Sequence, residues 1–176
     1  MSSFCRVITG VSGSPRNLRA LRYAAALARG QDATLIPVLA WVPPGGETAD
    51  RRYPSGYLRR VWVEDAWKRL HDALDAALGG LPDDVATEPM VVRGQFGPVL
   101  VDEASHPGDL LVIGTGRHGT AGRLFSGKVS RYCLAHAGCP VLAVPPTALE
   151  LQAGHSLHRW TFRHCDLSLR ELIAER

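Results

Sequence analysis

The sequence contains no apolar run long enough to cross a membrane. A membrane-spanning helix needs about twenty consecutive apolar residues, and the apolar runs of this 176-residue chain are shorter. Residues 1–7 lead directly into a strand-like run, without the basic and apolar regions of a signal peptide. We therefore expect a cytoplasmic protein that has no membrane as a partner.

Cysteine is scarce, and charge of one sign is not concentrated anywhere. The four cysteines are not closely spaced as in zinc sites, and each lies in or beside an apolar run. This predicts buried free thiols at Cys5, Cys133, Cys139 and Cys165 and no metal site. The net charge of +3 comes from basic residues scattered among acidic ones, which gives no reason to expect a nucleic acid partner.

The patterns of common phosphate-transferring enzymes are also absent. The chain has no Walker-type Gly-x-x-x-x-Gly-Lys-Ser/Thr stretch and no pair of carboxylates placed to hold Mg²⁺ or to activate a nucleophile. Asp109 precedes an apolar run, so it would lie at the wrong end of a strand. His118 is a lone loop histidine, and such residues are usually solvated. We expect no catalysis, with a weak ATPase as the lesser alternative.

The most informative stretch is residues 109–144. A short apolar run typical of a buried strand is followed by a glycine-rich loop from Gly114, a helical pattern from Ser126 and a second strand at 140–144. A strand, a glycine loop and a helix N-terminus in succession are well suited to hold phosphate, because free N–H groups and the helix dipole favour an anion. A plain strand-to-helix turn has the same pattern, so both interpretations stay open.

Strands and helices alternate through most of the chain. Strands are predicted at 5–11, 33–42 and 86–93, and helices at 15–30, 58–78 and after Gly94. This order predicts a doubly wound α/β fold, with a parallel sheet covered by helices on both faces. Ligands of such sheets bind at the carboxyl ends of strands where the winding reverses. We expect residues 12–14 and 114–126 to face each other across that crevice.

Two segments interrupt the alternation. Residues 43–57 combine proline, glycine and charge without an apolar period, which predicts a long loop that serves as a lid or an excursion. After Pro146 the sequence is mixed and polar, and only residues 167–174 have helical spacing. We therefore expect an α/β domain over residues 1–146 and a C-terminal extension with a short helix over residues 147–176.

Residues 109–145 resemble the C-terminal half of a universal stress protein domain, through the glycine loop from Gly114, the helix after Ser126 and the strand Pro140-Val-Leu-Ala-Val. The opening Val7-Ile-Thr-Gly-Val-Ser-Gly-Ser-Pro is similar to that family's first strand and turn. The resemblance covers residues 6–144. It implies a five-stranded parallel sheet in the order 3-2-1-4-5 and a role in stress survival. It also implies a homodimer formed through the last strand, at Val141, Leu142, Ala143 and Val144.

Many members of that family bind ATP, so the resemblance implies ATP, accompanied by Mg²⁺, as the ligand. In those members, a glycine, two residues, a second glycine, nine residues, a third glycine and a hydroxyl residue hold the ribose and phosphates. Gly114 and Gly127 match the first and third glycines of this motif, whereas Arg117 and Lys128 replace the second glycine and the hydroxyl residue.

A shifted register pairs Gly116 with Gly119, although it leaves too few residues before Gly127. Ser12 stands where the family usually has an aspartate. Lys128 at a helix N-terminus supplies a positive charge in place of the hydroxyl group.

The leading hypothesis is a regulatory stress-response protein that binds a nucleotide of the ATP or AMP type, or another anion, at the crevice between strands one and four. The candidate binding residues are Gly10, Ser12, Gly13, Ser14, Ala40, Trp41, Gly114, Gly116, Arg117, Gly119, Gly127 and Lys128. Ala40 or Trp41 would contact the base, although ordinary packing is the competing interpretation of Trp41. The alternative function is a stress protein that acts only through an unknown protein partner, with Arg117 filling the phosphate space.

Overall fold

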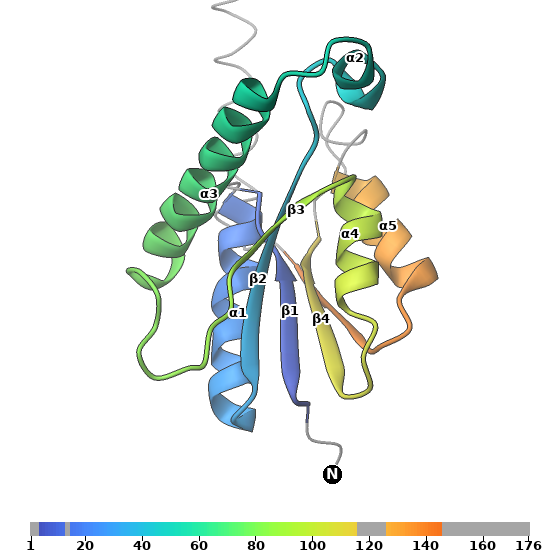
Figure 1. The fold of residues 1–176 in the computed structure, drawn as a ribbon. Helices are drawn as coiled ribbons and strands as arrows, with labels where there is room; N and C mark the ends of the chain where they lie inside the picture. Colours follow the sequence, from blue (N-terminus) through green and yellow to red (C-terminus); the bar gives the residue numbers. More distant parts are fainter. Residues whose placement is uncertain (1–3, 13–14, 116–125, 146–176) are drawn as a thin grey trace, which may run out of the picture. The chain divides into compact units, whose positions relative to one another are not determined.

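Five strands form one parallel sheet in the order β3-β2-β1-β4-β5 (Figure 1). They are β1 (Arg6–Gly10), β2 (Thr34–Trp41), β3 (Met90–Arg93), β4 (Asp109–Gly114) and β5 (Val141–Val144). The doubly wound fold and the strand order expected from the sequence are confirmed. Short runs rich in valine, leucine and isoleucine form these strands because the sheet buries most of them on both faces.

The structure describes residues 4–12, 15–115 and 126–145. These lie within the first of two units of the chain, Met1–Pro145. The tail from residue 146 onward lies outside the described residues, so the division into a domain over 1–146 and an extension over 147–176 stays a prediction. None of the helices in the described ranges is long and apolar enough to cross a membrane.

Helices cover both faces of the sheet. Helices α1 (Pro15–Gln31) and α3 (Gly56–Leu78) pack on one face, and α4 (Phe96–Glu103) and α5 (Ser126–His136) pack on the other (Figure 1). Because successive side chains of a strand point to opposite faces, β1 and β2 supply both cores. Val7 and Leu35 pack toward α1 and α3, whereas Ile8 and Ile36 pack toward α4 and α5.

Pro37 lies within β2, which has a neighbouring strand on each side. The Leu35 N–H donates to the Ala86 carbonyl (2.8 Å), and the Leu35 carbonyl accepts from the Glu88 N–H (2.9 Å). The backbone N–H and C=O groups of Leu35 therefore point toward the β3 side. Backbone groups two residues apart in a strand point toward the same neighbouring strand. The backbone nitrogen of Pro37 therefore also faces the β3 side. The β2–β3 ladder begins only at Val38 and Met90. The missing N–H of the proline therefore costs no bond of that ladder.

The segment 43–57 contains a helix that the sequence analysis missed. This is α2 (Gly46–Arg52), which lies beyond the carboxyl end of β2 (Figure 1). Its sequence, GETADRR, is polar on every side and therefore has no apolar period. Ion pairs with residues outside the helix hold it against the rest of the domain. The Asp50 carboxylate lies 2.9 Å from Arg59 and 2.6 Å from Arg93.

Three smaller expectations were wrong or incomplete. Only Met90–Arg93 of the expected strand 86–93 is regular, with Thr87 forming an isolated bridge to Leu35. Cys5 is exposed, not buried, because it precedes β1 at the rim of the sheet. Cys133 is buried as expected, and burial raises its pKa to about 11, while Cys139 is partly buried. Cys165 lies outside the described residues.

Candidate functional site

The winding of the chain reverses between β1 and β4. After β1 the chain enters α1 on one face of the sheet, and after β4 it leads to α5 on the other face. The carboxyl ends of the two strands, at Gly10 and Gly114, therefore mark the edge where ligands of doubly wound sheets bind. This confirms that strands one and four are neighbours, as the predicted crevice requires.

Gly10 is needed here for packing. A β-carbon added to it would lie 2.7 Å from the ring of Phe96 and 2.8 Å from Leu100. Real side chains do not approach so closely, so a larger residue would displace the Phe96 ring. The glycine therefore lets α4 seat an aromatic ring directly on the end of β1.

Hydrogen bonds fix the backbone where the strands end. The Val11 N–H donates to the Val38 carbonyl (2.8 Å), and the Asn17 amide donates to the Ser12 hydroxyl (2.8 Å). After β4, the Thr115 N–H donates to the Val144 carbonyl (2.9 Å), and the Ser130 hydroxyl donates to the Gly114 carbonyl (3.3 Å). Asn17 on α1 and Ser130 on α5 thus hold the two strand ends from opposite faces.

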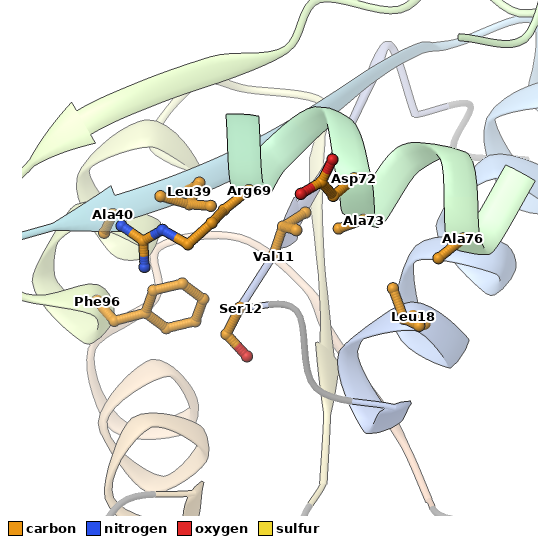
Figure 2. Close-up of a pocket in the computed structure, with 10 residues that line it drawn as sticks. All are labelled: Val11, Ser12, Leu18, Leu39, Ala40, Arg69, Asp72, Ala73, Ala76 and Phe96. Atoms are coloured by element: carbon orange, nitrogen blue, oxygen red, sulfur yellow. The ribbon is translucent and has the colours of Figure 1, made fainter. Parts of the chain in front are cut away.

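A cleft of about 300 Å³ opens at the carboxyl ends of β1 and β2, under α3. We name it the α3 cleft; its lining residues are Val11, Ser12, Leu18, Leu39, Ala40, Arg69, Asp72, Ala73, Ala76 and Phe96. Figure 2 shows the Arg69 side chain extending from α3 toward Ala40 and Phe96, with Leu18 and Ala76 at the opposite end. Of the described residues in this wall, Ser12, Arg69 and Asp72 are polar or charged and the others are apolar.

A second hollow of about 440 Å³ lies on the other face of the sheet. We name it the α5 cleft; it is lined by Ala40, Val42, Gly94, Gln95, Phe96, Gly97, Pro98, Lys128, Val129 and Tyr132. Gly97 allows α4 to approach α5, because a β-carbon there would lie 3.0 Å from the Tyr132 ring. Ala40 and Phe96 line both clefts, so the two hollows adjoin at these residues.

A comparison with protein families identifies the family of this chain. A model described as the universal stress protein family matches residues 3–145. The chain belongs to the universal stress protein family. A universal stress protein from Thermus aquaticus, named for its position in the QAH/OAS sulfhydrylase 3' region, is 31% identical over 142 residues. The match spans 80% of this chain and 98% of that relative.

Solved universal stress proteins share the fold. One that was crystallised in complex with cAMP is 28% identical, has a TM-score of 0.52, and is matched over 81% of this chain and 98% of its own. Universal stress protein UspA from Lactobacillus plantarum has a TM-score of 0.57 over 82% of this chain and 99% of its own. At 19% identity, the second likeness supports the fold alone.

The described part of this universal stress protein places six of the twelve predicted binding residues at the carboxyl edge of the sheet or beside it. Ser12 lines the α3 cleft, Lys128 lines the α5 cleft, and Ala40 lines both. Gly10 and Gly114 end β1 and β4, and Gly127 lies in the first turn of α5. The remaining predicted residues of the loops, Gly13, Ser14, Gly116, Arg117 and Gly119, lie outside the described residues.

Trp41 is the candidate that the structure places in the core. Its side chain is only 8% exposed and packs 6.4 Å from the Trp62 ring, measured between centroids. The Arg93 guanidinium lies 5.6 Å from its ring. Trp41 points to the α1 and α3 face, opposite to Ala40, and it is not among the described residues that line either cleft.

Most residues that line these clefts were not predicted from the sequence, among them the charged and aromatic side chains of Arg69, Asp72, Phe96 and Tyr132. Arg69 and Asp72 lie on the polar side of α3, where charged residues are usually just solvated. Their only sequence signal is their position beside Ala73, which belongs to the apolar stripe that packs on the sheet. Phe96 follows the glycine of a strand-to-helix turn, and its role depends on Gly10, which is distant in sequence.

The rim near α2 carries a concentrated group of charges. Arg93 at the end of β3 lies 2.7 Å from Glu47 and 2.6 Å from Asp50, and Arg59 of α3 also binds Asp50. The hydrogen bond from Arg59, followed by that from Arg93, holds the pKa of Asp50 below its ordinary value. The Asp50 side chain is only 1% exposed, and a buried charge needs a partner. The two arginines supply the compensating charge.

Proposed function

We propose that this protein binds an adenine nucleotide at the carboxyl edge of its sheet and acts as a regulator in the cytoplasmic stress response. The observation that carries the proposal is the position of the two adjoining clefts, which meet at Ala40 and Phe96 beside the ends of β1 and β2. Ligands of doubly wound folds bind outside the carboxyl ends of the strands, and β1 borders the point where the winding reverses. A 28% identical universal stress protein was crystallised with cAMP, which supports a nucleotide as the ligand class.

The phosphate would lie at the start of α5. Helix α5 begins at Ser126, so the backbone N–H groups of its first turn have no acceptor within the helix, and the positive end of the helix dipole lies there. Lys128 is exposed in that turn and lines the α5 cleft, where its ammonium group adds a full positive charge. These features favour an anion even though lysine replaces the family's hydroxyl residue.

Ser12 is compatible with a nucleotide whose phosphate lies at the start of α5. A serine beside the strand end adds no negative charge, so it does not repel a phosphate as an aspartate would. Its hydroxyl accepts from Asn17 at 2.8 Å, which holds it at the wall of the α3 cleft. Arg117, Gly116 and Gly119 would complete the phosphate site from the loop after β4, as part of this proposal.

The described residues do not fit a protein-bound Mg²⁺. They contain no group of three or more His, Cys, Asp or Glu that could hold a metal ion. Asp72 is the one carboxylate among the described residues that line either cleft, and it is paired with Lys68 at 2.7 Å. Any Mg²⁺ in the complex would therefore arrive on the phosphates of the nucleotide itself.

We also propose a homodimer formed by pairing β5 with β5 of a second copy. In the described sheet β5 pairs only with β4, so its other edge is unpaired. Leu142 and Ala143 are exposed on this edge strand, and a free apolar edge favours pairing with another strand. Leu142→Glu should convert a dimer into a monomer, as measured by light scattering on a gel-filtration column. An unchanged mass would contradict pairing through β5.

The alternative function, action through a protein partner without a nucleotide, is favoured by a different observation. Tyr53 and Tyr57 are 79% and 71% exposed, and Leu58 and Val61 are also exposed on the neighbouring turns of α3. Exposed apolar groups of this kind are typical of protein contacts. If this alternative holds, the glycine loop is a relic of a nucleotide site.

Thermal unfolding separates these functions. A ligand that binds only the native state at one hundred times its dissociation constant stabilises it by about 2.7 kcal/mol. That corresponds to a rise in midpoint temperature of roughly 5 to 10 °C for a chain of this size. We expect such a rise with millimolar ATP, ADP, AMP or cAMP, tested with and without MgCl₂. No rise with any of the four would reject nucleotide binding.

Two matched variants locate the phosphate. Lys128→Gln should weaken binding of ATP about tenfold, because it removes a charge-assisted contact. Arg29→Gln removes the same charge from the last turn of α1, which leads toward the amino ends of the strands. It should leave the affinity unchanged. Equal losses in both variants would mean that only the net charge matters.

A further inference from the structure

We propose that Arg69 and Phe96 form the two sides of a slot that holds the planar base of the nucleotide, and that Arg69 is thereby the residue that selects ligands with a base. The inference rests on the proposed nucleotide function and assigns the base to the α3 cleft. The observations that carry it are the position of Arg69 in this cleft and the charge balance of its wall.

Arg69 is paired with a carboxylate of its own helix. Its Nε lies 2.9 Å from the Asp65 carboxylate, one turn earlier on α3. This ion pair uses an edge of the guanidinium and leaves its two faces for stacking. In Figure 2 the side chain extends from α3 over the cleft toward Phe96 and Ala40, away from Leu18 and Ala76. A planar guanidinium that is paired at its edge can stack on a ring without giving up that pair.

Phe96 supplies the opposite side. Its ring is seated on Gly10, where a β-carbon would lie 2.7 Å from Cζ, so the end of β1 fixes its position. It lines the α3 cleft together with Leu39 and Ala40, which close the floor. A base stacks favourably on an aromatic ring. A guanidinium over the other face of the base adds a further favourable contact.

The charges assign the base, not the phosphate, to this cleft. Asp65 and Asp72 on α3 balance Arg69 and Lys68, so this part of the wall has no net positive charge. Lys128 belongs to the α5 cleft on the other side of Ala40 and Phe96. A volume of about 300 Å³ is at the lower end of ligand pockets, which suits a single ring system better than a whole nucleotide.

Isothermal titration of the full chain with AMP and with ribose 5-phosphate tests the slot. The two ligands share the phosphate and the sugar, and only AMP has a base. Arg69→Ala should weaken AMP binding fivefold to thirtyfold and leave the binding of ribose 5-phosphate unchanged. Arg69→Lys should lose most of the same affinity, because an ammonium group has no planar face. Arg60→Ala removes an exposed arginine of the same helix that lines neither described cleft, so it is the matched control.

Phe96→Leu gives a second arm that does not depend on Arg69. Because this variant can also lower stability, the readout is the ratio of the AMP and ribose 5-phosphate affinities, which is independent of the folded fraction. We expect the ratio to fall at least fivefold. Binding of AMP by the wild type with unchanged ratios in the Arg69 and Phe96 variants would overturn the slot alone. If the wild type bound neither ligand, the nucleotide function would fail, and the slot with it.

Discussion

The two ends of the sheet are built differently. At the amino end, Arg6 and Asp109 begin neighbouring strands and pair at 2.8 Å, and the Asp109 carboxylate, only 1% exposed, also accepts from the His106 N–H. The Arg6 guanidinium further donates to the Glu103 carbonyl at 2.7 Å. At the carboxyl end, β1 and β4 stop at glycines, and two clefts open beside the ends of β1 and β2. Polar groups therefore close one end of the sheet, whereas the other end leaves room for a ligand.

This difference also explains why Asp109 is not a catalytic candidate. It is the buried carboxylate of β4, but it lies at the first residue of the strand, at the end opposite to Gly114. Its oxygens are engaged by Arg6 and by the backbone of residue 106. Burial and ion pairing can mark either a functional site or a structural one, and here the position in the sheet indicates a structural one.

The largest loss of stability should come from removing the buried ion pair at the amino end of the sheet. Asp109→Ala removes the buried partner of Arg6 and an acceptor of the His106 N–H, so we expect a loss of about 2 to 3 kcal/mol in the free energy of unfolding. Urea denaturation measures this loss. Asp84→Ala, which breaks the exposed Arg29–Asp84 pair, should cost less than about 1 kcal/mol. If both variants lost the same free energy, the closed end would not be a special source of stability.

A smaller loss of stability, together with weaker nucleotide binding, is expected from a substitution at the carboxyl end of the sheet. Gly10→Ala places a methyl group against Phe96 and Leu100, and such overpacking typically costs about 1 to 3 kcal/mol. Because Phe96 lines both clefts, this variant should also weaken nucleotide binding, whereas Asp109→Ala should not. Denaturation and titration of the two variants give the comparison. A Gly10→Ala protein with unchanged stability and affinity would mean that the Phe96 ring moves away without consequence.

The α2 rim should give the carboxyl end a sensitivity to acid. Arg59 and Arg93 lower the pKa of Asp50 in the folded state. The stability from these contacts is therefore fully present above the ordinary aspartate pKa of about 4 and is lost as pH falls through the lower folded value. Asp50→Asn should be less stable at neutral pH and should lose less stability than the wild type below about pH 4. Unfolding measured between pH 7 and pH 3 checks this, and parallel curves would contradict it.

The smallest expected effect on stability is at the proposed phosphate position. Lys128 is exposed in the first turn of α5, where a positive charge is opposed by the helix dipole. Lys128→Gln should therefore leave the free energy of unfolding unchanged or raise it by a few tenths of a kcal/mol. Equilibrium denaturation checks this value. A clear loss of stability would show that Lys128 serves the fold, and its effect on ligand affinity would need another explanation.

The fold could be predicted from the sequence because its signals are local. Apolar runs such as 109–113, turn residues and helical periods each depend on neighbours in the chain, and their order determines the doubly wound arrangement. Helix α2 was missed because it depends on distant pairs, from Asp50 to Arg59 and to Arg93. A polar helix with no apolar stripe has no local signal to detect.

The site was only partly predictable for the same reason. Ser12 and Lys128 were named as candidates because they follow a strand or open a helix, and each lines one of the clefts, while their role in binding stays a prediction. Arg69 and Phe96 were not named because they reach the α3 cleft only through the packing of α3 and α4 at the ends of the strands. Ala40 or Trp41 was expected to contact the base, with ordinary packing as the competing interpretation of Trp41, and the alternation of β2 turns Trp41 to the core.

The most direct test of a ligand site at the open end is the backbone amide NMR spectrum of the isotope-labelled protein, recorded during titration with AMP. We predict shift changes at Gly10 to Ser12, at Ala40, at Gly114 and in the first turn of α5, with the amides of Arg6, His106 and Asp109 unchanged. No change at any amide, or changes confined to the amino end of the sheet, would contradict the account.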